Sequence, residues 1–315
     1  MKWLKNILQA LHIRRKKILW GIGVFVLTSY LLFKLVDWLY PLNTERLSYS
    51  TVVLSSDGSI MSAFLSRDDK WRIQIRKEDI PEGLKKAFIF KEDKYFFIHP
   101  GVNLIALARA FFQDIRARHV VSGASTITMQ VARMLSPERR TFFNKFKEIF
   151  KALQLESHYS KEEILEMYFN LLPYGGNVEG IKAASVIYLH KLPIDLSPAE
   201  IATLMIVPNS PRHYRFDNNN GAIIAGRNKW LERFGKAKLF KDKEIQQAIS
   251  EPLSAKRMEI PKIAPQFCIQ MASKIKDQSY IRTNIDLNLQ KKAQNVLTEY
   301  VQKLSLLNIT NAAVL

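Results

Sequence analysis

The chain has 315 residues, of which 47% are hydrophobic and 24% are charged, and this ordinary composition makes disorder a poor default. Lys and Arg number 47 against 29 Asp and Glu, so the formal net charge is +18. Such an excess predicts an anionic partner, which charge alone leaves open among nucleic acid, phospholipid headgroups and a phosphorylated substrate. Cys268 is the only cysteine, which excludes an intrachain disulfide, and its apolar neighbours predict a buried thiol.

The first predicted element is a membrane-spanning helix. Residues 18–33 carry no charge, and the stretch continues to residue 36 apart from Lys34, whose long side chain can reach the interface. Its length is therefore about the minimum that spans a bilayer. Basic residues precede the stretch, whereas an acid and aromatic residues follow it. This asymmetry predicts a cytoplasmic tail over 1–17, an anchor over 18–40 and an extracytoplasmic location for the rest.

A cleaved signal peptide is the alternative to this anchor. The small-residue cleavage pattern is missing between Leu35 and Pro41, which favours a retained helix. An extracytoplasmic location argues against nucleic acid as the partner of the basic charge. It favours the anionic leaflet and a pyrophosphate-bearing lipid.

A short β element is predicted over 41–80. Residues between Leu47 and Ile75 alternate in the manner of strands, and Asp57 followed by Gly58 predicts a hairpin turn.

From Pro81 onward the pattern is helical. Two helix starts carry capping boxes, Ser160 with Glu163 and Ser197 with Glu200. Apolar residues then recur at helical spacing and predict a core-facing stripe. The stripe consists of Ile164, Leu165, Tyr168, Phe169 and Leu172.

The segment EDKYFFIHPG, residues 92–101, places Glu92 and Asp93 beside three aromatic residues. Such surroundings suit a carboxylate that acts as a general base. Alone the signal is weak, because acids at the end of a helix are usually solvated.

Two further polar clusters follow. The segment GASTITMQ, residues 123–130, offers hydroxyl groups that can bind a sugar or a phosphate, or can cap a helix. A basic cluster then surrounds Glu148, and it can form a solvated helix face or hold a pyrophosphate. Its members are Arg133, Arg139, Arg140, Lys145 and Lys147.

These segments, with NKFKE, SKEEILEMYFNLLPYGG and LSPAEIATLMIVPNSP, resemble in order and spacing the five motifs of the glycosyltransferase family 51 peptidoglycan polymerases. The resemblance implies a mainly α fold: a lysozyme-like glycosyltransferase lobe with a small membrane-associated lobe, beside the transmembrane helix and the short β element. It implies a glycosyltransferase domain over 81–248, a linker over 249–282 and the truncated start of a transpeptidase domain over 283–315. Met129 and the stretch Arg140–Glu156 are similar to the penicillin-binding protein 1C branch of the bifunctional enzymes.

Matched by position, the resemblance implies two catalytic residues. Glu92 would deprotonate the acceptor 4-hydroxyl, and Glu148 would position the donor and its leaving pyrophosphate, with inversion at the anomeric carbon. The implied substrate-binding residues are Asp93, Ser125, Thr126, Thr128, Gln130, Arg133, Arg140, Lys145 and Lys147. Asp93 is alternatively a metal contact or a structural acid, and His99 is expected to be structural.

The resemblance also implies partners and cofactors. Lipid II, the growing glycan strand, the membrane and other wall-synthesis proteins are the expected partners, and nucleic acid is not. No metal ligand set and no obligatory cofactor are expected, although a divalent cation, magnesium or manganese, can assist the departure of pyrophosphate.

The chain departs from the family pattern at three positions. Family members commonly have glutamine at the position of Met129, arginine at that of Asn144 and aspartate at that of Asn103, so Asn144 removes one cation from the donor site. Residues 102–121 match the family's membrane-dipping lobe, and an ordinary amphipathic core helix is the alternative.

The last segment leaves the function open in one respect. Residues 283–294 resemble the entry to a transpeptidase domain, whereas the SxxK pattern at 273–276 precedes that domain and lacks its companion motifs, so we reject it as a catalytic serine. We therefore expect no peptide crosslinking by this chain. Two competing functions remain, a lysozyme-like glycan hydrolase with Glu92 as acid and an inactive membrane-bound scaffold.

Overall fold

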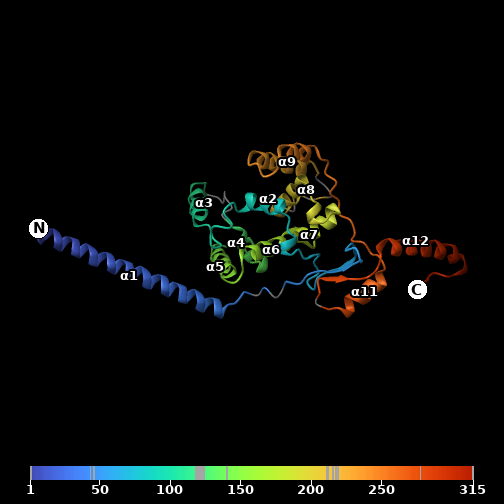
Figure 1. The fold of residues 1–315 in the computed structure, drawn as a ribbon, viewed down its shortest axis with the longest axis horizontal. Coiled ribbons are helices and arrows are strands. Elements are labelled where there is room, and N and C mark those ends of the chain that lie inside the picture. The colour runs from blue at the N-terminus through green and yellow to red at the C-terminus, as the bar shows by residue number, and fades with distance from the viewer. Residues whose placement is uncertain are drawn as a thin grey trace. The chain divides into compact units, whose positions relative to one another are not determined.

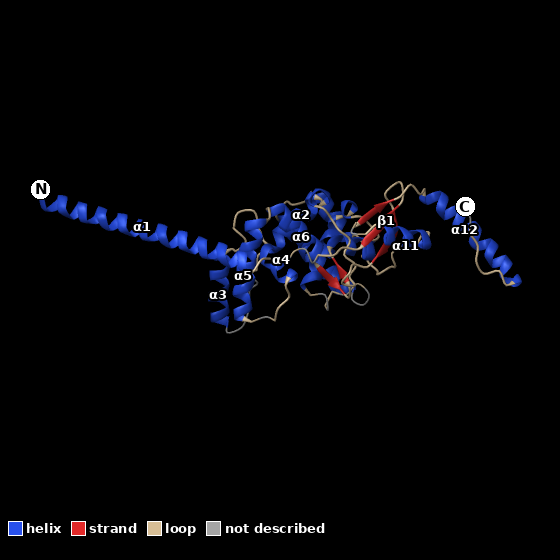
Figure 2. Cartoon of the chain, turned by 90° about the horizontal axis from the view of Figure 1, so that it is seen from below, coloured by secondary structure: helices blue, strands red, loops and turns tan. Residues whose placement is uncertain are grey.

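The computed structural model describes residues 2–42, 44, 47–117, 125–139, 141–210, 213, 214, 216, 220–276 and 278–313. It divides into two compact units, Met1–Thr44 and Glu45–Leu315. The first unit contains α1 (Lys2–Leu39). The second contains, in chain order, β1 (Thr51–Leu54), β2 (Ile60–Phe64), η1 (Lys77–Asp79), α2 (Glu82–Glu92), α3 (Leu104–Ala117), α4 (Ile127–Leu135), α5 (Phe142–His158), α6 (Lys161–Leu171), β3 (Pro173–Gly175), β4 (Val178–Glu179), α7 (Ile181–Ala184), η2 (Ser185–Leu189), η3 (Pro193–Asp195), α8 (Pro198–Ile206), η4 (Val207–Asn209), α9 (Asn220–Lys236), α10 (Asp242–Ser250), α11 (Pro265–Lys274), β5 (Tyr280–Arg282), α12 (Leu287–Leu304) and η5 (Ser305–Leu307) (Figures 1 and 2).

The helix α1 confirms the predicted apolar N-terminal helix. Its part from Lys17 to Leu39 is long and apolar enough to cross a membrane, with a mean hydropathy of 1.9, and none of that window is buried within the protein. Exposure of this apolar surface to water is unfavourable in free energy, whereas the hydrocarbon core of a membrane accommodates it.

The β element forms a small three-stranded sheet in the order β2-β1-β5. The antiparallel pairing of β1 with β2, with Gly58 at φ +87° in the turn, confirms the predicted hairpin. The strand β5 pairs parallel to β1, with Val52 opposite Tyr280. The sequence predicts only a linker there, because three residues are too few to show an alternating pattern.

Most of the second unit is helical, as predicted. The two capping boxes are confirmed at the starts of α6 and α8, where Ser160 and Ser197 each accept a hydrogen bond from the backbone of the glutamate three residues later. The predicted stripe on α6 is buried, and Phe88 of α2 packs edge-on against Phe169, with ring centroids 5.0 Å apart. The thiol of Cys268 is also buried, as predicted.

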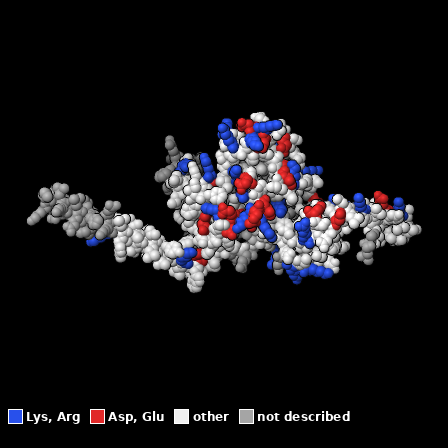
Figure 3. Space-filling view, viewed as in Figure 1, with Lys and Arg blue, Asp and Glu red and all other residues white. Residues whose placement is uncertain are grey.

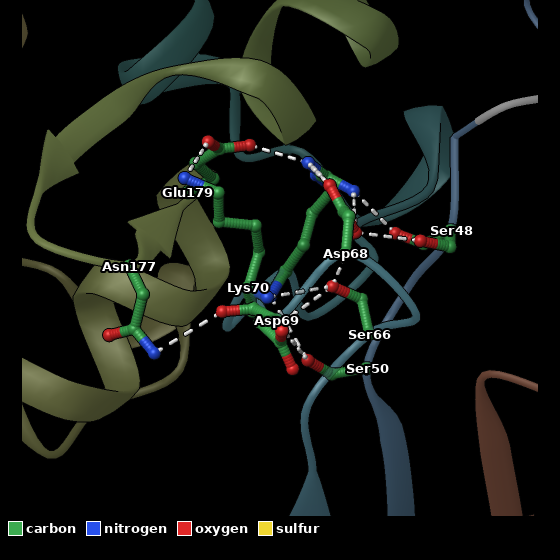
Figure 4. Close-up of polar contacts among 9 residues, drawn as sticks. Ser48, Ser50, Ser66, Asp68, Asp69, Lys70, Asn177 and Glu179 are labelled. Carbon is green, nitrogen blue, oxygen red and sulfur yellow. Dashed lines mark hydrogen bonds and ion pairs between the residues drawn. The ribbon is translucent and has the colours of Figure 1, made fainter.

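A polar network joins the β element to the helical body (Figure 4). Arg72, with a side chain 5% exposed, donates to Glu179 of β4 at 2.5 Å and pairs with Asp68 at 2.9 Å. The backbone of Trp71 adds two hydrogen bonds: its N–H donates to the carbonyl of Asn177 at 2.8 Å, and its carbonyl accepts from Glu179 N at 3.0 Å. The β3–β4 hairpin, whose first strand ends the fourth motif, is therefore fixed to residues 68–72.

Candidate active site

Glu92 is the last residue of α2, and donors from three elements hold its carboxylate. Gln130 of α4 donates to Oε2 at 3.1 Å, and Asn209 of η4 donates to Oε1 at 3.2 Å. Lys91 also pairs with Oε1. The side chain of Glu92 stays 12% exposed, so a substrate hydroxyl can still reach it.

Lys91 is a residue that the sequence analysis missed. Its side chain is 6% exposed, and its ammonium group also donates to the backbone carbonyl of Met205 at 3.0 Å. Asn209 was missed as well, although it stands within the fifth motif. In sequence, a lysine or an asparagine next to a helix end is indistinguishable from a surface residue, because its partners come from other elements.

The second carboxylate, Glu148 of α5, lies in a basic cluster. Lys145 lies 2.9 Å from Oε1 and also donates to the hydroxyl of Ser125 at 2.7 Å. Arg133 of α4 is 3.9 Å from Oε2, and its side chain is 36% exposed. The structure thus brings four predicted residues together in one cationic group: Ser125, Arg133, Lys145 and Glu148. The side chains of Arg133 and Lys145 (34% exposed) remain accessible to an anionic ligand.

The helix α4 connects the two carboxylate sites. Gln130, which contacts Glu92, and Arg133, which faces Glu148, are one helical turn apart. The phenol of Tyr168 on α6 responds to both Glu92 and Arg133. Burial raises its pKa well above the ordinary value, the negative charge of Glu92 raises it further, and the positive charge of Arg133 opposes this shift.

The hydroxyl-rich segment divides into two kinds of residue. Ser125 and Gln130 are partly exposed and face the carboxylates. Thr126 is buried, caps α4 by accepting from Met129 N, and donates to the carbonyl of Gly101 at 2.5 Å. Thr128 is fully buried and donates to Glu156 at 2.6 Å. The structure therefore favours the capping alternative for Thr126 and an internal structural contact for Thr128, and it does not bring either hydroxyl to Glu92 or Glu148.

Asp93 is likewise held in the interior. Its carboxylate accepts from Ile127 N at 3.0 Å and lies 2.9 Å from Nε2 of His99, and its side chain is 4% exposed. These contacts tie the segment after α2 to the start of α4. They favour the structural alternative for Asp93 and agree with the structural role expected of His99.

The remaining predicted residues have other surroundings. Lys147 pairs with Glu138 at 3.3 Å rather than with Glu148. Arg140 lies outside the described residues. Asn144 donates from Nδ2 to the carbonyl of Arg139 at 2.8 Å, which closes the turn before α5.

The other two departures from the family pattern are structural. Met129 is fully buried and packs with Val102 and Ala152. Asn103 accepts from Ala106 N at 2.9 Å at the start of α3, a contact that an aspartate would also make.

The helix α3 has both an exposed and a packed side. Leu104 and Ile105 are 75% and 76% exposed, whereas Leu107 packs against the cluster of Val102, Met129 and Ala152. Large exposed apolar residues at the first turn suit a helix that touches a membrane, and the packed side holds the helix to the body.

A metal does not fit the side chains at this site well. Within the part of the chain that the structure describes, no group of three or more His, Cys, Asp and Glu side chains is placed to hold a metal ion. Glu148 already has Lys145 and Arg133 as partners, which leaves a poor donor set for a cation. The assisting divalent cation stays a prediction, and the reaction proposed for this site does not require it.

The site thus holds two carboxylates, a hydrogen-bonded Glu92 and a Glu148 paired with cations, and a comparison with known families gives the class of protein. The family model described as Transglycosylase matches residues 57–234, and the chain belongs to this family. The resemblance inferred from the five motifs is thereby confirmed.

Two curated relatives agree with this family assignment. The chain is 38% identical over 268 residues to Penicillin-binding protein 1C of Escherichia coli (strain K12), covering 85% of this chain and 35% of that protein. It is 34% identical over 270 residues to Penicillin-binding protein 1A of Pseudomonas aeruginosa, covering 82% of this chain and 32% of that protein. A crystal structure of Penicillin-Binding Protein 1A from Haemophilus influenzae gives 17% identity and a TM-score of 0.38 over 81% of this chain and 30% of that one. The chain thus spans about a third of the length of the curated relatives it matches.

Proposed function

We propose that the chain is a peptidoglycan glycosyltransferase that polymerises lipid II into glycan strands, with inversion at the anomeric carbon and release of undecaprenyl pyrophosphate. One observation supports this best: α4 contributes to two sites at once. Its Gln130 contacts the accessible Glu92, which has three hydrogen-bond donors, and its Arg133 belongs to the cationic group at Glu148. A transferase with a pyrophosphate leaving group needs a base near the attacking hydroxyl and positive charge near the departing pyrophosphate.

Glu92 acts as the general base in this proposal. It takes the proton of the acceptor 4-hydroxyl while the hydroxyl oxygen forms a bond to the anomeric carbon of the donor strand. Gln130 and Asn209 fix the direction of the carboxylate, so little reorganisation is needed during the transfer. Attack from the face opposite the leaving group inverts the configuration.

The leaving group departs toward the cationic group. The bond between the anomeric carbon and the phosphate oxygen breaks, and its electron pair leaves with the pyrophosphate. Arg133 and Lys145 stabilise the growing negative charge, and Glu148 holds both cations in position.

The membrane anchor completes the proposal. The span in α1 would keep the enzyme at the bilayer that carries its lipid substrate, with the catalytic domain on the extracytoplasmic side of the bacterial inner membrane. The boundaries proposed for the domains are those inferred from the sequence, 81–248 for the glycosyltransferase and 283–315 for the start of a transpeptidase. Other wall-synthesis proteins are the proposed macromolecular partners, and nucleic acid is not.

The test is polymerisation of lipid-linked disaccharide-peptide by the detergent-purified chain, with products resolved by length. Glu92→Gln should lower the rate by about 10²–10⁴-fold, the range for loss of a general base. Glu232→Gln, which removes an exposed carboxylate on α9, is the matched control and should leave the rate unchanged. Failure of the wild type to polymerise would favour the scaffold, and shortening of added glycan would favour the hydrolase.

A further inference from the structure

A cavity separate from the candidate active site lies on the side of α2 that faces away from the core. Its volume is 480 Å³, and neither Glu92 nor Glu148 lines it. The residues of α2 that line it are 82, 85, 86, 89 and 90, which recur at i, i+3, i+4, i+7 and i+8, whereas Leu84, Ala87 and Phe88 are buried on the opposite side. The floor is apolar and consists of Ile80, Ile89, Phe90, Phe97, Leu165 and Leu239.

The mouth of this cavity is positively charged. Four lysines and two glutamates line it, namely Lys77, Lys85, Lys86, Lys94, Glu82 and Glu162. Lys85 is 3.2 Å from Glu82, and Lys77 is 3.6 Å from Glu163. Lys86 and Lys94 have no ion-pair partner among the described residues, and both are exposed. On the face drawn in Figure 3, basic and acidic side chains are interspersed and do not form one continuous basic patch.

We propose that this cavity binds the headgroup and the first part of an acyl chain of an anionic phospholipid. The chemistry of the walls matches such an amphiphile: the ammonium groups of Lys86 and Lys94 would meet the phosphate, and the floor from Ile89 to Leu239 would cover the chain. A volume of 480 Å³ is too small for a packed peptide helix, which is 10–12 Å across.

The neighbouring surface favours a membrane lipid over an acidic peptide. Tyr95, Phe97 and Ile98 are 52%, 55% and 80% exposed, and Phe97 is itself a lining residue. Exposed large apolar residues beside a basic mouth are typical of a surface that rests on lipid headgroups. The inference rests on the membrane anchorage included in the proposed function.

The experiment is native mass spectrometry of the full chain in detergent micelles, titrated with phosphatidylglycerol or with phosphatidylcholine of the same acyl chains. The wild type should retain phosphatidylglycerol in preference. Lys86→Gln with Lys94→Gln should weaken that binding roughly 25-fold, because each lysine near an anionic lipid contributes a factor of about five. Lys229→Gln with Lys236→Gln removes the same charge from the exposed face of α9 and should change it little.

Three results would overturn the inference: equal losses in both double variants, equal retention of the two lipids, or preferred binding of a phenylalanine-containing acidic peptide at Lys86 and Lys94. Polymerisation assayed without added phosphatidylglycerol separates this inference from the proposed function. The variant at Lys86 and Lys94 should polymerise at the wild-type rate there. If the wild type forms polymer but shows no preference for phosphatidylglycerol, only the lipid site is refuted. If it prefers phosphatidylglycerol but forms no polymer, only the proposed transferase is refuted.

Discussion

Lys91 is expected to support Glu92, the proposed general base, without touching the substrate. It is nearly buried and links Glu92 to the carbonyl of Met205 at the end of α8. Lys91→Met should lower kcat by about 10–100-fold with little change in KM, because hydrogen bonds to charged groups contribute about 1.5–3 kcal/mol. Lys91→Arg should recover part of the loss.

The measurement is steady-state polymerisation for both variants, corrected for the folded fraction from thermal unfolding. The Lys91→Met variant also leaves the Met205 carbonyl without a donor, so some loss of stability is expected. A fall in kcat that vanishes after this correction would show that Lys91 is a purely structural residue.

Thr128 and Ser125 should respond to mutation in opposite ways. Thr128→Val keeps the shape but leaves Glu156 with one donor fewer, so we expect a loss of about 1–2 kcal/mol in stability and nearly normal activity per folded molecule. Ser125→Ala removes one of the two partners of Lys145, the other being Glu148, so we expect reduced activity and unchanged stability. Thermal unfolding and polymerisation assays of both variants test this, and matching effects in the two would refute the division of the segment.

Individual side chains show where sequence reasoning reached its limit. The motifs identified Glu92, Ser125 and Gln130, which the structure places at the site. They did not separate these residues from Thr128 and Asp93, because a hydroxyl or carboxylate near a helix start can bind a substrate or satisfy the backbone equally well. Only the fold decides which side chains point inward.

The turn over residues 66–72 should make the β element sensitive to acid. Burial pushes the pKa of Asp68 upward, but hydrogen bonds from Arg72, Ser66 and Ser48 outweigh it and hold the pKa well below the ordinary value. Because the pKa is lower in the folded state, this stabilisation is complete above the unfolded-state pKa of about 3.9 and fades as the pH falls below it.

The corresponding variant is Asp68→Asn. At neutral pH it should lower stability by about 1–2 kcal/mol, a modest value because the Asp68 side chain is 47% exposed, which corresponds to a fall of roughly 2–8 °C in Tm. The difference in Tm between wild type and variant should shrink below about pH 4. A difference that stays constant between pH 3 and pH 7 would contradict this account of the network.

Local signals predicted the elements better than distant ones. The capping boxes of α6 and α8 lie within four residues of sequence, and both formed as predicted. The strand β5 instead depends on its pairing with β1, far earlier in the chain. Its three residues gain their structure from tertiary contacts, which no local pattern records.

Membrane attachment ties together the charge, the apolar helix and the proposed lipid substrate. The net charge of +18 alone would allow a peripheral protein that high salt removes, whereas the span from Lys17 to Leu39 predicts retention in salt. Leu27→Arg with Leu31→Arg should cost roughly 5–7 kcal/mol of insertion free energy, since each central arginine costs about 2.5–3.5 kcal/mol.

Washing membranes at high salt and measuring the retained chain checks this prediction. Wild type should stay in the pellet, and the Leu27 and Leu31 variant should move to the supernatant. The control is Gln246→Arg with Gln247→Arg, which adds the same charge to the exposed face of α10 and should not change retention. Release of the wild type by salt would mean that basic charge alone holds the chain to the membrane. The anchor would then no longer explain how the chain stays beside the lipid-linked donor of the proposed reaction.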